Sequence, residues 1–148
     1  MKYDHSAQVN VHIHAPLQAV WEALTKPEII KKYFFGTNFI TDWVPGHKIV
    51  FEGEWEGKKY QDKGTVLAYK EYEQLKYDYW SSMSGMEDMP ENYGLITYDV
   101  SEDGGVTILV ITQENIPDEN RKEHSMENWK IILLELKKLL EVQESGTR

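Results

Sequence analysis

Two histidines on one predicted strand are the first candidates for chemistry in this sequence. One residue separates His12 from His14, so a β-strand would present both imidazoles on one face, a geometry that can hold a metal ion. Val9, Val11 and Ile13 alternate with them and form the opposite, apolar face. Because that face is expected to turn toward the core, the histidines are expected to point to water. The pattern predicts a solvated surface here and no metal site.

Carboxylates are the next candidates, because general acid–base catalysis needs a carboxyl group whose pKa burial has raised. Asp78, Asp99 and Glu114 lie on predicted strands, but the alternation does not place them inward. The sequence contains no Ser-His-Asp spacing, phosphate-binding glycine loop or HExxH segment. It also contains no cysteine, which excludes disulfides, thiolate catalysis and cysteine-based metal sites. We therefore expect no cofactor, and catalysis remains an open alternative without a residue set to support it.

The overall composition restricts the classes of partner. The chain has 148 residues, of which 41% are hydrophobic, and 25 acidic against 16 basic residues give a formal net charge of −9. Such a charge disfavours both nucleic acid and an anionic membrane as partners. No segment reaches the ~18 apolar residues of a membrane span, and the N-terminus has no apolar signal-peptide core. We expect one domain over residues 1–148 and a cytoplasmic location.

The elements that would position these residues follow from the periodicity of the sequence. A strand near residues 9–14 leads into a helix at Pro16 and a second short helix at Pro27. Further strands are predicted at residues 37–41, 49–55, 60–72, 75–80, 93–100 and 106–114. Gly64, inside one of them, is a candidate for a bulge or a close backbone approach.

A long amphipathic helix is predicted for residues 121–142, with Asp118 as its N-cap. Its apolar stripe consists of Met126, Trp129, Ile132, Leu133, Leu136, Leu139 and Leu140. A helix this apolar on one face must pack against another layer, and the one-sided sheet is the available partner.

Several motifs together resemble the helix-grip superfamily, which includes START domains, birch-pollen-allergen-type proteins and polyketide cyclases. They are A-P-L-Q-A-V-W-E-A-L-T-K-P-E at residues 15–28, the aromatic pair Tyr33-Phe34 and the dipeptide Pro45-Gly46. Within the superfamily, residues 64–66, 71–79 and 123–140 resemble the branch named after the activator of Hsp90 ATPase. At one position the chain differs from the family pattern, because Asn128 precedes Trp129 where members usually carry Gly.

The resemblance implies an α+β helix-grip fold: a curved antiparallel sheet of about six or seven strands, two short helices and a long C-terminal helix. It also implies a cavity between the sheet and that helix. The residues available to line the cavity are Phe34, Phe35, Phe39, Phe51, Trp55, Tyr77, Tyr79, Tyr98, Trp129 and Leu133. Trp129 is the strongest single candidate, because the family places this side chain toward the cavity. The alternative is that the same aromatic side chains simply fill the core.

Three functions are compatible with a helix-grip fold of this composition. The leading hypothesis is a non-catalytic protein that binds a small hydrophobic or aromatic molecule. The second is a protein-interaction module acting on a chaperone or another protein, and the third is a cyclase-like or hydrolase-like enzyme. Met83, Met86 and Met89 lie in a polar loop, for which three roles are open: a lid over a pocket mouth, a contact with a partner, or packing on the nearest sheet edge. A monomer or weak dimer is expected.

Overall fold

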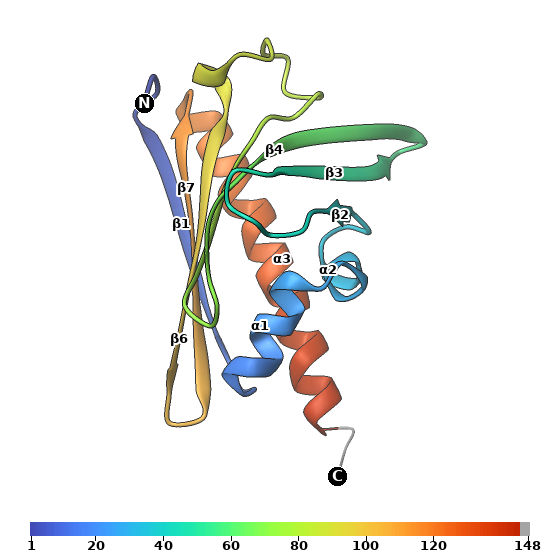
Figure 1. The fold of residues 1–148 in the computed structure, drawn as a ribbon, viewed down its shortest axis with the longest axis vertical. Helices are drawn as coiled ribbons and strands as arrows, with labels where there is room; N and C mark the ends of the chain where they lie inside the picture. Colours follow the sequence, from blue (N-terminus) through green and yellow to red (C-terminus); the bar gives the residue numbers. More distant parts are fainter. Residues whose placement is uncertain (146–148) are drawn as a thin grey trace.

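A seven-stranded antiparallel sheet and three α-helices form the structure (Figure 1). A computed structural model describes residues 1–145, with side chains through residue 141. The strands are β1 (His5–Ile13), β2 (Asn38–Ile40), β3 (Lys48–Trp55), β4 (Lys58–Lys70), β5 (Gln74–Tyr79), β6 (Gly94–Asp103) and β7 (Val106–Ile116). The helices are α1 (Leu17–Thr25), α2 (Pro27–Tyr33) and α3 (Glu119–Ser145), with a short 3-10 helix η1 (Pro90–Asn92) before β6.

The strand order β1-β7-β6-β5-β4-β3-β2 follows from the hairpins, except that β1 joins the sheet beside the last strand. Every strand pair is antiparallel. The sheet curves, and the long helix α3 runs across it with α1 and α2 on the same side (Figure 1). The predicted helix-grip α+β fold is therefore confirmed.

Local sequence signals account for the residues at which α2 and α3 begin. Pro27 is the first residue of α2, where its missing N–H costs no helical hydrogen bond. Asp118 lies just before α3 and its Oδ1 accepts a hydrogen bond from the backbone N–H of Arg121 at 2.8 Å. The predicted N-cap is thus present, and it satisfies one of the free N–H groups of the first turn.

The backbone of β4 approaches β5 closely at Gly64. The strand pairs with β5 along its C-terminal half, whereas its N-terminal half forms the hairpin with β3 that projects to one side (Figure 1). A Cβ at Gly64 would overlap the carbonyl oxygen of Asp78 and lie 2.7 Å from its carbonyl carbon. The Oδ1 atom of Asp78 accepts a hydrogen bond from the N–H of Thr65 at 2.8 Å. The predicted close approach is confirmed, and only glycine fits it.

The core lies between the inner face of the sheet and the apolar stripe of α3. Trp129, Ile132, Leu133, Leu136 and Leu140 are all buried, and Met126 and Leu139 lie half-buried beside them. On β1, Val9 and Ile13 are buried and His12 is exposed, and His14, just after the strand, is exposed as well, as the alternation predicts. No group of three or more potential metal ligands occurs within residues 1–145. In that same range no helix is long and apolar enough to cross a membrane.

Candidate functional site

Six of the predicted site residues form a closed cycle of aromatic contacts inside the fold. Going round the cycle, neighbouring ring centroids are 4.8–6.0 Å apart, and most pairs meet edge to face. The members of this aromatic cycle are Phe34, Phe39, Phe51, Tyr77, Tyr98 and Trp129. They come from the end of α2 and from β2, β3, β5, β6 and α3. These side chains pack against one another, as aromatic side chains do in a filled core.

Two buried hydroxyl groups face each other in the aromatic cycle. The hydroxyl oxygens of Tyr77 and Tyr98 are 2.9 Å apart, and burial raises the pKa of both phenols well above the usual value. One hydroxyl therefore donates to the other, and both stay protonated at neutral pH. This hydrogen bond compensates for taking two polar groups out of water.

Three other predicted residues lie away from the cycle. Leu133 lies on the buried face of α3, with 3% of its surface exposed. Phe35 and Trp55 are exposed at 45% and 55%, and their rings meet edge to face with centroids 6.4 Å apart. Trp55 ends β3, in the hairpin that projects beyond the core, and Phe35 has a left-handed backbone with φ of 54°. The structure thus does not bring these two residues into the core with the other predicted site residues.

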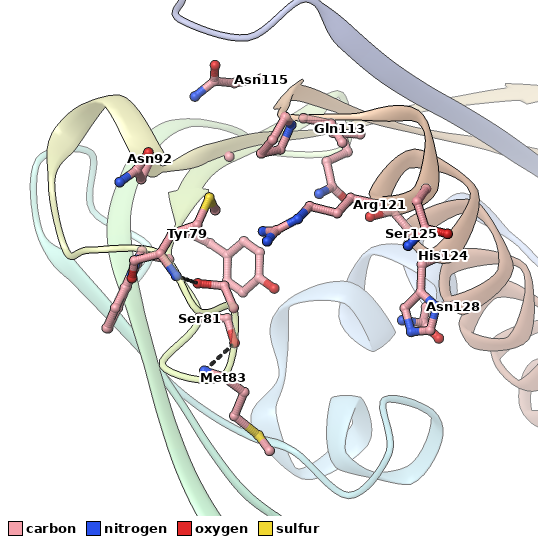
Figure 2. A pocket seen from close by; sticks show the side chains of 17 residues that line it. Tyr79, Ser81, Met83, Asn92, Gln113, Asn115, Arg121, His124, Ser125 and Asn128 are labelled. Atoms are coloured by element: carbon pink, nitrogen blue, oxygen red, sulfur yellow. Dashed lines mark hydrogen bonds between the residues drawn. The ribbon is translucent and has the colours of Figure 1, made fainter.

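A pocket of about 400 Å³ opens where the ends of β5, β6 and β7 meet the first turns of α3 (Figure 2). Tyr79 is the one predicted residue that lines it, and its ring also contacts Phe51 of the aromatic cycle at 5.8 Å. Besides this ring, the apolar part of the lining consists of Trp80, Met83, Met86, Ile116 and Pro117. The polar part consists of Ser81, Ser84, Asn92, Gln113, Asn115, Asn120, Arg121, His124, Ser125 and Asn128.

Hydrogen bonds orient several of these polar groups. The Oε1 atom of Gln113 accepts from the indole N–H of Trp129 at 2.9 Å, which leaves the amide Nε2 to donate to a ligand. The hydroxyl oxygens of Ser81 and Ser84 accept backbone N–H bonds from Met83 and Met86, each at 3.2 Å. Ser84 keeps its hydroxyl proton for donation, whereas the Ser81 side chain also hydrogen-bonds with Asp62 and Tyr79.

Tyr79 and Arg121 approach the pocket from opposite layers. The ring of Tyr79 comes from the sheet, and the side chain of Arg121 reaches toward it from α3 (Figure 2). Burial raises the pKa of Tyr79 to about 12, so its phenol is a hydrogen-bond donor at neutral pH. The Nε atom of Arg121 lies 3.5 Å from Oδ2 of Asp118, a partly exposed pair at the mouth.

The carboxylates considered for catalysis lie elsewhere. Asp99 is exposed and accepts a hydrogen bond from Gln74 at 2.9 Å, and Glu114 is half-buried on β7. Burial raises the pKa of Asp78, although its contact with Thr65 opposes the shift. None of these three residues lines the pocket. The lining contains one imidazole, that of His124, and no carboxylate.

Sequence and structure comparisons identify the family. The family described as "Activator of Hsp90 ATPase homolog 1-like protein" matches residues 14–141. The chain belongs to this family. The expected branch of the helix-grip superfamily is thereby confirmed, and the family match covers β2 to β7, α1, α2, most of α3 and every residue that lines the pocket. A comparison with curated protein sequences finds no match.

Solved structures agree with this membership in the activator of Hsp90 ATPase homolog 1-like family. The solution structure of ChR145 from Cytophaga hutchinsonii is 43% identical, with a TM-score of 0.83, and the match covers 98% of this chain and 99% of that one. An Aha1 dimer from Colwellia psychrerythraea is 18% identical with a TM-score of 0.73, covering 93% and 97%. CalU16 from Micromonospora echinospora is 21% identical with a TM-score of 0.70, covering 88% and 73%. The last two show the fold alone.

The pocket residues on α3, which the sequence analysis did not indicate, are all polar. On α3, Arg121, Ser125 and Asn128 continue the line of the buried stripe toward the N-terminus, but they are polar. The signal that could have revealed them is a helix face that is apolar and buried from Trp129 onward but polar and less buried before it. Asn128, which departs from the usual family Gly, is itself a lining residue.

Proposed function

We propose that this protein binds a small molecule with an aromatic or hydrophobic body in the pocket between the sheet and α3. The observation that carries the proposal is the pocket itself: about 400 Å³, with apolar side chains on one part and oriented hydrogen-bond donors on the other. Pockets of roughly 300–1,000 Å³ with this combination are typical of small-molecule sites. Apolar burial provides affinity there, and the few donors fix the orientation of the ligand.

The loop before η1 supports the same proposal. Met83 and Met86 line the pocket, and Met83 is 55% exposed, so it has room to move onto a ligand. Methionine side chains adapt to ligands of different shape. The indole N–H of Trp80 donates to the backbone oxygen of Met86 at 3.1 Å, which holds this part of the loop against the sheet. Of the three interpretations of the methionine loop, we propose the lid over the pocket.

Blocking the pocket is expected to abolish binding. Ser125 lines it from α3, and Ser125→Trp would place an indole in the space that the ligand needs. With the neutral fluorophore N-phenyl-naphthylamine as the probe, we expect the wild-type protein to bind it and the variant to lose at least about tenfold in affinity, or about 1.4 kcal/mol. Ile131→Trp is the matched control, because Ile131 is 48% exposed on α3 and does not line the pocket. Equal affinity in the wild type and both variants would place binding elsewhere.

A second candidate function is binding to another protein, as the family name suggests. The edge-to-face Phe35–Trp55 pair favours it, because two large exposed aromatic rings are typical of a protein contact. In addition, the left-handed backbone of Phe35 costs free energy that a bulky residue normally avoids.

For this candidate, the purified protein is added in excess to Hsp90 and ATP hydrolysis is measured. Stimulation is expected in the wild type and is expected to fall at least about tenfold in potency in the double variant Phe35→Ser, Trp55→Ser. The control is Leu67→Ser, which removes a side chain that is 41% exposed on β4. An absence of stimulation at any excess would remove this candidate and leave the small-molecule proposal untouched.

A further inference from the structure

We infer that the ligand carries a carboxylate, which Arg121 binds at the mouth of the pocket while the aromatic or hydrophobic body lies deeper. The inference rests on the proposed function, since it names the chemical class of the molecule that the same pocket would take. It follows from the charges of the lining, the position of the guanidinium and the kind of hydrogen-bonding groups that surround it.

The lining has a charge opposite to that of the protein. Of the 148 residues 25 are acidic, and the formal net charge is −9. Nevertheless, no Asp or Glu occurs among the 17 side chains that line the pocket. Arg121 is the one Lys or Arg of the lining, and His124 lies one turn further along α3. An anion approaching most of this surface is repelled, whereas at the pocket it meets the Arg121 cation, whose one carboxylate contact within residues 1–145 is with Asp118, outside the lining.

The guanidinium of Arg121 is placed to make this contact. Figure 2 shows it extending from α3 into the pocket, with Gln113 and Tyr79 nearby. Its contact with Asp118 joins Nε to Oδ2 at 3.5 Å, longer than a strong charge-assisted hydrogen bond, and Asp118 does not line the pocket. A guanidinium has five N–H donors in a fixed plane, so the terminal nitrogens can bind both oxygens of a carboxylate.

The neighbouring groups donate as well. Gln113 presents its Nε2 because Trp129 holds its Oε1, and the phenol of Tyr79 remains protonated at neutral pH. The hydroxyl of Ser84 accepts a backbone N–H bond from Met86 and keeps its own proton to donate. A carboxylate accepts hydrogen bonds and donates none, so it matches a site rich in donors better than an amine or an alcohol does.

The test compares naphthoate with the naphthamide of the same isomer, which has the same shape and no charge. Binding of each is followed by backbone amide chemical shifts of the full chain. The wild type is expected to bind naphthoate more tightly, and Arg121→Gln is expected to weaken naphthoate by about five- to tenfold while leaving naphthamide unchanged. Arg121→Lys keeps the charge without the planar fork and is expected to recover part of the loss. Lys122→Gln is the matched control, since it removes the same charge from a residue that does not line the pocket.

The outcomes separate this inference from the proposed function. If both probes bind with equal affinity and Arg121→Gln changes neither, the pocket binds small molecules but does not select a carboxylate, and the inference is overturned alone. If Lys122→Gln weakens naphthoate as much as Arg121→Gln does, only the general surface charge matters and the inference also fails. If neither probe binds, and the neutral fluorophore does not bind either, the proposed function fails together with it.

Discussion

Replacing Gly64 with alanine is expected to destabilise the protein by about 3 kcal/mol or more, close to the upper end of single-residue effects. The new methyl group would overlap the backbone carbonyl of Asp78, and a carbonyl held in a sheet cannot rotate away as a flexible side chain could. Either β4 moves away from β5 or the hydrogen bond between Thr65 and Asp78 is lost. Urea unfolding followed by circular dichroism would measure the change in the free energy of unfolding.

Gly94→Ala is the control for this prediction. Gly94 also lies in a strand, but the nearest atoms to its added Cβ are 3.7–3.9 Å away, an ordinary van der Waals distance. We expect a change within about 1 kcal/mol. If both glycine variants were equally stable, the close approach at Gly64 would not require glycine.

Replacing Trp129 with alanine is expected to cost about 3–5 kcal/mol, as do other large-to-small substitutions of buried aromatic residues. The indole is 8% exposed and contacts Phe34 and Tyr98 edge to face, with centroids 5.7 and 6.0 Å away. Its removal opens the aromatic cycle and releases Gln113 at the pocket floor. Chemical denaturation of the variant would report the loss of stability.

Two companion variants interpret the result. Trp129→Phe keeps an aromatic ring but loses the indole N–H, and we expect it to cost less than the alanine variant. Ile131→Ala, on the exposed side of the same helix, is expected to change the free energy of unfolding by no more than about 0.5 kcal/mol. A Trp129→Ala variant as stable as Ile131→Ala would contradict the role that we assign to the aromatic cycle.

The fold was predictable because its signals are local and agree with one another. The alternation of Val9 and Ile13 identifies β1, Asp118 marks the start of α3, and the stripe through Leu133 identifies the buried face. Gly64 was recognisable as a special position because glycine is unusual inside a strand.

The site was predictable only in part, for two physical reasons. Alternation tells which face of a strand a residue occupies, but not how far the opposing layer extends. Trp55 therefore has the correct parity for the core and still lies outside it, since the β3–β4 hairpin is longer than the layer beneath it. Polar pocket residues such as Arg121 and Gln113 have no periodic signal, because their neighbours come from distant segments of the chain.

The aromatic cycle has a consequence for how the chain folds. Its members are spread from Phe34 to Trp129, so closing it requires contacts between residues almost a hundred positions apart. The chain loses loop-closure entropy before such contacts can stabilise it, and proteins that depend on them fold slowly. During synthesis Trp129 leaves the ribosome last among the six. We therefore expect the native core to form in one late, cooperative step, after α3 has emerged.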